Sequence, residues 1–399
     1  MKKKLTSVFL VLTACLVFLS GCWDSREMDD LGIGVALGID KTEEGKYVVY
    51  VQLINPSEIA TEAPSTRPPV SLYKEEGDTL FEALRKMTTT SPRRVYLSQL
   101  RLVVLSSALA EEGILSTLDF LYRDHNMRTS FFLTVAKDSN VEDILSVITA
   151  YEKIPANKVM DTLKNAEESW AATHGVNIDD VISDIHSKGI HPVMTGVTMK
   201  GSEEIGNNIS NVENIDSPTR LEVDNLAIFK GDRLIGWLNE DESKGYNDIA
   251  GNVKGTIVNL PCEEGEGKVA IEIIRTQAAI ESEMNNEKPA IIVSLEAEAN
   301  VGEVQCDIDL SKIKTIKKLD EQLEKTLKDR MELAIDSAQE KYKSDIFGFG
   351  NSIHRQHPKY WKKVEKSWDE HFPELDVKVD VSTDIRRKGT TAQPAIKEG

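Results

Sequence analysis

The sequence predicts an α+β (mixed α/β) protein with more than one domain. Two observations carry this prediction. Strand-like apolar runs alternate with helical patterns from residue 31 to about 195, and two long strand patterns followed by a long amphipathic helix occupy much of 221–388. We therefore expect mixed sheets flanked by helices, with one long C-terminal helix packed on a sheet. Hydrophobic residues make up 40% of the chain, which is enough for real cores.

The first residues have the pattern of a lipoprotein signal peptide. Three lysines precede an apolar run from Leu5 to Leu19. At about 15 residues, this run is shorter than the ~20 that a membrane-spanning helix needs. The small residues Ser20 and Gly21 stand directly before Cys22. We expect cleavage between Gly21 and Cys22, with diacylglyceryl and N-acyl lipidation of Cys22; an ordinary secretory signal that contains a cysteine is the alternative.

The segment after the cleavage site is expected to act as a short membrane-proximal tether over residues 22–30. Eight residues, Trp23–Asp30, separate Cys22 from the first strand, and eight residues span at most about 28 Å. The sequence shows no second hydrophobic segment long enough to cross a membrane. We expect the body to stay close to the extracytoplasmic face of the membrane, held durably by several acyl chains.

The mature chain is expected to be acidic. The formal charge of −18 becomes −21 when Lys2, Lys3 and Lys4 leave with residues 1–21. This sign argues against binding of nucleic acid and against binding of anionic lipid headgroups by the body as a whole. It is compatible with simple solubility or with a basic partner surface.

The first expected strand, Leu31–Ile39, has two unlike faces. Bulky residues alternate with Gly32, Gly34, Ala36 and Gly38. Another element must approach the bare face closely, and a helix is the simplest candidate. A second strand over Lys46–Ile54 should follow as a hairpin.

The rest of an N-terminal α/β domain over residues 31–195 is expected to alternate loop, helix and strand. A proline-containing loop covers Asn55–Gly77, and a helix capped by Asp78 follows it. The next elements are the strand Leu100–Leu105, the helical segment Leu109–Tyr122 broken at Gly113, the strand Ser130–Ala136, the helix Val141–Tyr151, and two polar helices split near Gly175. Residues 196–220, rich in Gly, Asn, Ser and Glu, are either an interdomain linker or the tip of a long hairpin.

A C-terminal α/β region over 221–388, undivided or in two subdomains, is expected to contain long strands and a long helix. The strand Ala290–Val301 alternates apolar and mostly polar residues, so one face should be buried. The helix Ser311–Lys343 carries an apolar stripe and the pairs Glu321–Lys325 and Glu324–Lys328. The other elements are the hairpin Leu226–Phe229 with Arg233–Trp237, the strand Lys268–Ile280, the helix Pro358–Glu370, the strand Leu375–Ile385 and a disordered tail over 389–399.

Two cysteines, Cys262 and Cys306, remain beside Cys22 in the mature chain. Outside the cytoplasm they could form one disulfide. Both fall near the ends of expected strands, but the spacing does not fix the distance between them, so pairing stays open.

The sequence offers no convincing catalytic, cofactor or metal site. Gly32, Gly34 and Gly38 lie inside a strand with the wrong spacing for a dinucleotide fingerprint. His354 and His357 are three residues apart without a third ligand nearby, and His186 and His191 have no cysteine beside them. No nucleophile, zinc-protease or P-loop motif is present. We expect a protein without cofactor, metal or enzymatic activity; an envelope hydrolase would need a sheltered nucleophile beside a histidine.

Read in order, several short motifs resemble the Ger(x)C family, the lipoprotein C subunits of spore nutrient germinant receptors. They are Gly21-Cys22-Trp23-Asp24-x-Arg26-Glu27, Gly38-Ile39-Asp40, Phe81-Glu82-Ala83, Arg93-Arg94-Val95-Tyr96 with Arg101, Leu118-Asp119-Phe120-Leu121-x-Arg123-Asp124 with Arg128, Phe229-Lys230 with Gly236, Trp368 with Phe372-Pro373, and Ile385-Arg386-Arg387-x-Gly389. The chain departs from the family at Ser98-Gln99, often Gly-His, and at His125, often proline.

The resemblance implies a three-domain mixed α/β protein on the outer surface of the spore inner membrane. It also implies two partners: an A-type subunit, and a permease-like B-type subunit thought to bind the germinant. Direct binding of a small molecule by this chain is not expected. We expect a non-catalytic lipoprotein subunit of the receptor, with a stand-alone solute-binding or sensory lipoprotein as the alternative.

Overall fold

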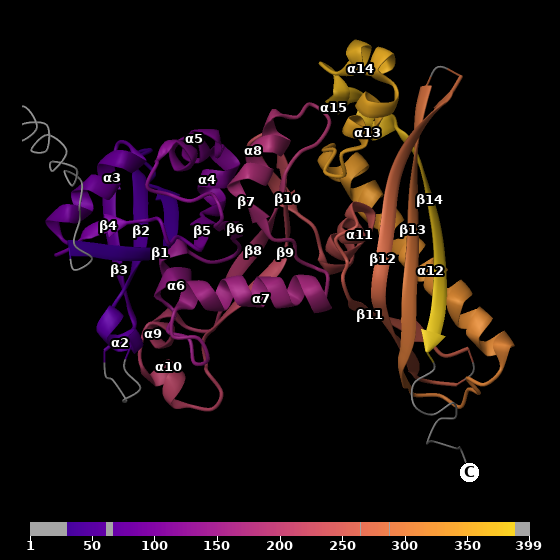
Figure 1. The fold of residues 1–399 in the computed structure, drawn as a ribbon, viewed down its shortest axis with the longest axis horizontal. Coiled ribbons are helices and arrows are strands. Elements are labelled where there is room, and N and C mark those ends of the chain that lie inside the picture. Colours follow the sequence, from indigo (N-terminus) through magenta and orange to yellow (C-terminus); the bar gives the residue numbers. More distant parts are fainter. Residues whose placement is uncertain (1–29, 61–66, 264, 287, 388–399) are drawn as a thin grey trace, which may run out of the picture.

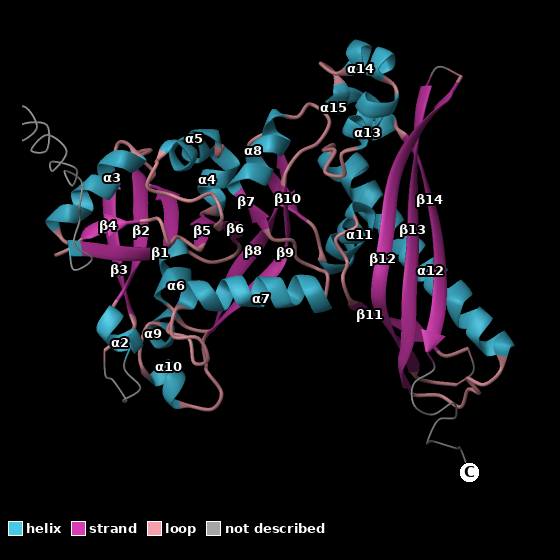
Figure 2. Cartoon of the chain, in the orientation of Figure 1, coloured by secondary structure: helices cyan, strands magenta, loops and turns pink. Residues whose placement is uncertain are grey.

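The chain folds around two β-sheets, one of ten strands and one of four (Figures 1 and 2). The structure is a computed structural model that describes residues 30–60, 67–263, 265–286 and 288–387. Helices flank both mixed sheets, so the expected α+β class is confirmed. The expected signal peptide, most of the tether and the tail lie outside the described residues.

The first sheet has the strand order β10-β9-β8-β6-β5-β1-β2-β3, with β4 paired to β1 and β7 to β6. β1, β4, β5 and β6 are mutually parallel where they pair, and β2, β3 and β9 run antiparallel to their neighbours. The strands are β1 (Leu31–Lys41), β2 (Tyr47–Ile54), β3 (Val70–Gly77), β4 (Arg94–Tyr96), β5 (Leu102–Leu105), β6 (Phe132–Ala136), β7 (Val176–Asn177), β8 (Val193–Lys200), β9 (Arg220–Lys230) and β10 (Arg233–Trp237).

Helices pack on both faces of this sheet. α3, α4, α5 and α8 share one core with it, and α6 and α7 share another on the opposite face (Figure 1). The helices of this part are α2 (Pro56–Ala60), α3 (Leu80–Lys86), η2 (Met87–Thr89), α4 (Ser107–Glu112), α5 (Leu115–Arg123), α6 (Val141–Ser146), α7 (Pro155–Ser169), α8 (Ile178–His186), α9 (Glu203–Gly206) and α10 (Ser210–Glu213).

As expected, other parts of the chain approach the glycines of β1 closely. A helix makes only some of these contacts. A Cβ atom at Gly38 would collide with Val141 and Leu145 of α6. At Gly34 the close neighbour is Leu97, in the loop after β4, 2.6 Å from the site of a Cβ. The register shifts between Gly34 and Ala36, and this irregularity turns the two glycines toward different neighbours.

Three local predictions in this part of the chain are wrong. The expected loop Asn55–Gly77 contains the strand β3, whose ladder to β2 does not depend on an apolar pattern. The cap of α3 is Thr79, not Asp78, because the Thr79 hydroxyl accepts the backbone N–H of Glu82. The helix α6 ends at Ser146, short of Tyr151.

Residues 201–219 connect β8 to β9, which pair with each other antiparallel. This segment is therefore the tip of a long hairpin and carries the short helices α9 and α10. Since β9 and β10 belong to the first sheet, that sheet continues past residue 195 to Trp237. The last residue of the first sheet, Trp237, thus lies beyond residues 196–220, which were expected to separate the two domains.

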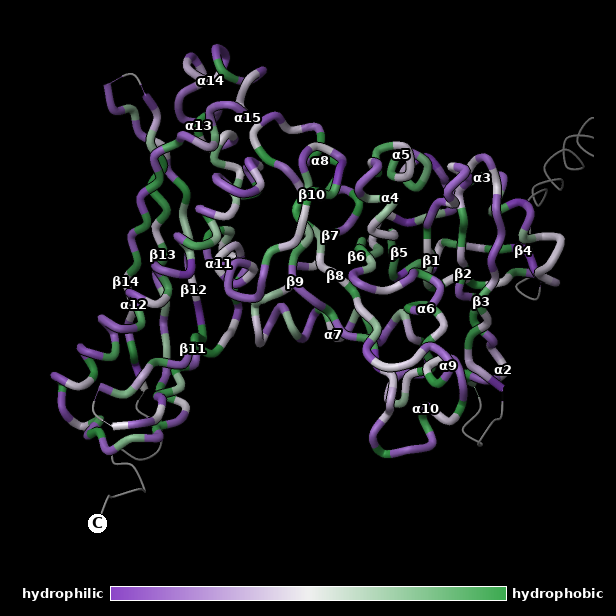
Figure 3. Tube along the Cα trace, turned by 180° about the vertical axis from the view of Figure 1, so that it is seen from behind, coloured by the Kyte–Doolittle hydropathy of each residue, from purple (hydrophilic) through white to green (hydrophobic). Residues whose placement is uncertain are grey.

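The second sheet has the order β11-β12-β13-β14, and its last pair is parallel. The expected alternation in β13 is confirmed, because Ile291, Val293 and Leu295 are buried while Glu296 is exposed. In Figure 3 green and purple residues alternate along these strands. The strands are β11 (Thr256–Pro261), β12 (Lys268–Asn285), β13 (Lys288–Val304) and β14 (Asp376–Arg387).

The long helix α12 (Ile313–Asp336) packs on this sheet, and its last turns continue as the π-helix η3 (Ser337–Tyr342). The expected ion pairs on it are wrong: Lys325 pairs with Asp329 and Lys328 with Glu332. The remaining helices are α11 (Glu240–Ala250), α13 (Phe349–Gln356), α14 (Pro358–Val364), α15 (Trp368–His371) and η4 (Phe372–Glu374). The sequence did not predict α11, α13 or β11.

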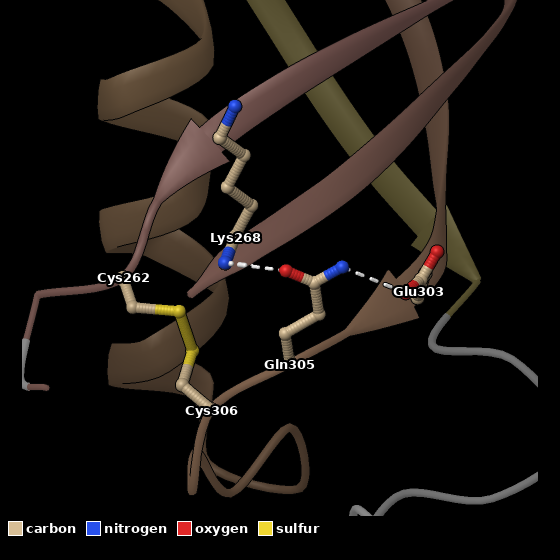
Figure 4. Close-up of a disulfide and its surroundings, with 5 residues drawn as sticks. All are labelled: Cys262, Lys268, Glu303, Gln305 and Cys306. Atoms are coloured by element: carbon tan, nitrogen blue, oxygen red, sulfur yellow. Dashed lines mark hydrogen bonds between the residues drawn. A yellow bond between two sulfur atoms is a disulfide. The ribbon is translucent and has the colours of Figure 1, made fainter. Parts of the chain in front are cut away.

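A disulfide joins Cys262 to Cys306, which resolves the question that the spacing left open. It links the residue after β11 to the segment after β13 (Figure 4). Beside it, the Gln305 amide donates to Glu303 and accepts the backbone N–H of Lys268. The bridge therefore closes one end of the second sheet.

Candidate functional site

The site residues that the sequence predicted, Gly21 and Cys22, lie outside the described residues. The structure does place the point where the body begins. Asp30 leads into β1, and Leu31 at the start of β1 stands opposite Arg94 of β4. None of the helices in the described ranges is long and apolar enough to span a bilayer.

We define the entry edge as the edge of the first sheet at which β1 begins. β4 begins there, opposite Leu31, and the parallel strands β5 and β6 begin further along β1, at the level of Ala36; β2 ends at this edge and β3 begins there. An open cleft of about 400 Å³ lies at this edge. Its lining includes Gly32, Asn55, Arg67, Ser71 and Arg93.

Hydrogen bonds fix the walls of this cleft. The Asn55 amide donates to the Pro68 carbonyl at 2.8 Å and to the Ser71 hydroxyl at 3.1 Å. The Ser91 hydroxyl donates to the carbonyl of Arg93 at 2.7 Å. These polar groups are therefore committed to shaping the loops, and the described residues that line the cleft include no histidine to act as a base beside a serine.

The entry edge carries several arginines. Arg94 begins β4, Arg101 precedes β5 and Arg128 precedes β6. These three side chains are exposed, and Arg93 is half-buried. Within the described part of the chain, no carboxylate lies within ion-pair distance of any of these four arginines.

The candidate metal-binding histidines have other partners. The ring of His354 stacks on Trp361 with centroids 5.7 Å apart, and Nε2 of His357 contacts the Ser282 carbonyl at 2.8 Å. His186 contacts the carbonyl of Ile182. No group of three or more potential ligands gathers anywhere in the described ranges.

His191 links the two parts of the molecule. Its Nδ1 accepts the backbone N–H of Gly231 at 3.1 Å, and Nε2 lies 3.1 Å from the Asp369 carboxylate on α15. This hydrogen bond, more than the partial burial that opposes it, lowers the pKa of Asp369. Nearby, burial raises the pKa of Asp184 to about 6, assisted by the charge of Asp180.

A buried ion pair lies where α11 crosses α12. Arg330 donates to Asp248 at 2.8 Å through Nε, and both side chains are almost fully buried. Burial raises the pKa of Asp248, and the Arg330 charge opposes that rise. The neighbouring Asn247 donates to the carbonyls of Ala171 and Thr173, which belong to the segment after α7. α11 therefore joins the first part of the chain to the second.

Asp345 organises the turn before α13. One carboxylate oxygen accepts the backbone N–H groups of Phe347, Gly348 and Phe349, and the other accepts those of Gly350 and the Trp368 indole at 2.8 and 2.9 Å. Burial raises the pKa of Asp345, whereas the five donors favour the charged form. A sequence signal existed here, because an aspartate before a Phe-Gly-Phe-Gly run suits a tight turn.

The geometry thus defines a two-sheet α+β protein. Its buried charges hold structural elements together, as Arg330 and Asp248 do for α11 and α12. Comparison with known proteins identifies the family. Residues 24–199 match the family described as "Spore germination protein N-terminal domain", and residues 224–389 match "Spore germination B3/GerAC like, C-terminal". The gap between the two matches covers residues 200–223.

Full-length relatives agree. The chain is 34% identical to Spore germination protein KC of Bacillus subtilis (strain 168) over 98% of both chains, and 26% identical to Spore germination protein B3 of the same organism, covering 98% of this chain and 100% of that one. The crystal structure of the GerBC protein shares the fold, with a TM-score of 0.54 at 20% identity over 88% of this chain and 96% of that one. The chain belongs to the Ger(x)C family of spore germination proteins.

Proposed function

We propose that this chain is a non-catalytic lipoprotein subunit of a spore germinant receptor, needed for nutrient-triggered germination. The observation that carries the proposal is the full-length match to spore germination proteins. The sequence before Cys22, which has the pattern of a lipoprotein signal peptide, supports the lipoprotein part of the proposal.

In this proposal Cys22 carries diacylglyceryl and N-acyl groups and holds the protein on the outer surface of the spore inner membrane. Its partners are an A-type subunit and a permease-like B-type subunit, and the B-type subunit binds the germinant. The role of this chain is to assemble or signal within the complex.

The test is Cys22→Ala in the chromosomal gene. We expect the protein to leave the spore membrane fraction and the germination rate with nutrient to fall at least about ten-fold, because a body without acyl chains loses its durable attachment. Cys15→Ala is the matched control, since Cys15 lies inside the apolar run and should leave with the signal peptide. A Cys22→Ala protein that stays on the membrane and supports normal germination would contradict anchoring through Cys22.

Pull-down of the tagged chain from spore membranes tests the partners. Recovery of an A-type and a permease-like subunit supports the complex, and recovery of neither contradicts it. Calorimetry of the mature chain against amino acids and sugars tests the alternative of stand-alone solute binding. That alternative usually requires two similar lobes, whereas the two sheets here differ in strand number and order.

A further inference from the structure

We propose that the entry edge faces the membrane and binds the phosphate groups of anionic lipids through its arginines. The proposal rests on the anchoring at Cys22 proposed above. It adds a second contact and an orientation of the body on the bilayer.

The first step is the convergence of arginines from separate segments. Arg94 begins β4, Arg101 precedes β5 and Arg128 lies in the segment before β6, so all three stand on the side of the sheet from which the parallel strands start. The backbone N–H of Arg101 donates to Val35, and the Arg101 carbonyl accepts from Phe132, both at 2.9 Å. These bonds hold Arg101 between β1 and β6. Arg94 lines a shallow pocket together with Asp124 and Asn126, so the segment that carries Arg128 lies beside β4.

The second step is their lack of acidic partners. Residues 83–110 contain five Lys or Arg and no Asp or Glu, in a chain with a formal charge of −18. Elsewhere basic residues pair with carboxylates, as Lys74 does with Glu142 and Arg386 with Glu298. Of the acidic residues at the entry edge, Asp124 already accepts two N–H groups of Asn126, and Asp30 and Glu58 do not balance the arginines.

The third step is the contrast with the opposite edge of the same sheet, where acidic residues outnumber basic ones. Glu43 and Glu44 form the β1–β2 turn, Asp78 follows β3, Glu112 ends α4 and Asp138 follows β6, against Lys41, Lys46 and Lys137. An anionic surface attracts the first edge and repels the second, so this charge separation orients the body.

The fourth step is reach. The eight residues Trp23–Asp30 leave the lipid anchor and enter the body at this edge, at most about 28 Å from Cys22. Electrostatic attraction fades within a Debye length of about 8–10 Å. The tether lets the arginines come within that range, where each basic residue strengthens the contact about five-fold. The planar guanidinium also matches phosphate oxygens in a bidentate fashion.

The experiment uses the lipidated mature chain in vesicles of phosphatidylcholine, with or without about 30% phosphatidylglycerol. Gln99→Cys places a single thiol for a donor dye between Arg94 and Arg101, because Cys262 and Cys306 are paired and Cys22 is acylated. Lys325→Cys places the same dye on α12. The acceptor dye is on lipid headgroups, and energy transfer reports proximity.

We expect transfer from position 99 to rise when phosphatidylglycerol is present, to fall with salt, and to exceed transfer from position 325. The triple variant Arg94→Gln, Arg101→Gln, Arg128→Gln should lose the rise. The triple variant Lys254→Gln, Lys328→Gln, Lys378→Gln, with the same charge change on other surfaces, should keep it. Thermal melting checks that each variant is folded.

Equal transfer with and without phosphatidylglycerol, or an unchanged rise in the arginine variant, would overturn the lipid contact. Transfer that rises only when the partner subunits are added would also overturn it and assign the edge to a protein surface. A labelled chain that does not float with the vesicles contradicts the anchor at Cys22, so failure of the proposed function is distinguishable from failure of this inference.

Discussion

The ten-stranded sheet is covered by helices on both faces, whereas described helices cover only one face of the four-stranded sheet. In the first sheet all four residues of β5 are buried. In the second, β13 alternates buried residues with residues that remain at least partly open to water. A sheet buried on one side has less apolar contact per strand. The second part of the chain therefore depends more on a few specific fixing points.

Those fixing points are Asp345, the disulfide and the close crossing of α11 and α12. Native-state hydrogen exchange resolved by peptide can follow the two sheets separately. Changes at these points should loosen β12–β14 and leave β5 and β6 protected from exchange.

The largest effect is expected for Asp345→Ala. Removal of the carboxylate leaves five buried N–H donors without an acceptor, and we expect the free energy of unfolding of the second part to fall by about 5 kcal/mol. Urea unfolding and hydrogen exchange measure it. Asp380→Asn, an exposed change in β14, should cost under about 0.5 kcal/mol. Equal losses in both variants would refute the role of Asp345.

The next effect is expected when Cys262 and Cys306 are both replaced by serine. The bridge closes a loop with a sequence separation of 44 residues, and its loss should cost about 4 kcal/mol in the chain-entropy model. Reduction of the native protein with dithiothreitol should give the same shift in urea midpoint. A midpoint that does not move in either experiment would show that the bridge does not stabilise the second sheet.

A smaller effect is expected for Gly245→Ala. A Cβ atom at this position in α11 would collide with the Arg330 carbonyl and lie 2.9 Å from the Ala334 side chain. The helices must separate to fit it, at a cost of about 2 kcal/mol. The control is Ala250→Gly at the exposed end of α11. Stabilisation by Gly245→Ala would mean that the crossing of α11 and α12 has room for a methyl group.

The smallest effect is expected in the first part, for Asp184→Asn. The folded-state pKa of about 6 lies above the ordinary value of 3.8, so the native state prefers the protonated acid. The charged form therefore costs stability above about pH 6, and this cost disappears as the pH falls toward 4. After allowance for solvent screening, we expect Asn to add about 1 kcal/mol at pH 8 and almost nothing at pH 4.

Urea unfolding of both proteins at the two pH values measures this difference. Asp179→Asn, at an exposed position of the same helix, controls for the loss of one surface carboxylate. An equal effect of Asp184→Asn at both pH values would mean that the carboxylate is solvated in the folded protein.

The sequence predicted the elements that have an apolar pattern and missed those that do not. β12, β13 and α12 follow clear periodicities, and the structure contains all three. α11 has no apolar stripe, because polar side chains such as Lys244, Asn247 and Asp248 fill its buried positions. β3 ends in Lys-Glu-Glu-Gly and is held by its ladder to β2.

The sequence did not predict the disulfide or the cluster of arginines. The spacing of Cys262 and Cys306 contains no information about their distance, which only the pairing of β11, β12 and β13 creates. The arginines of the entry edge are scattered in sequence, and only the parallel pairing of β1, β5 and β6 brings them together. Net charge alone suggested that the body avoids anionic lipid. The net charge sums the basic residues of the entry edge with the acidic residues of the opposite edge, so it does not report their separation.

The parallel pairing of β13 with β14 determines when the second sheet can complete its folding during synthesis. Ala290 pairs with Asp376, so a strand made early must wait until the long helix and α13–α15 have been synthesised. Such distant pairing slows folding. Until β14 arrives, β13 presents an open edge that can pair with another chain. A ribosome that stops before residue 376 therefore releases a product prone to aggregation, while the first sheet is already complete by Trp237.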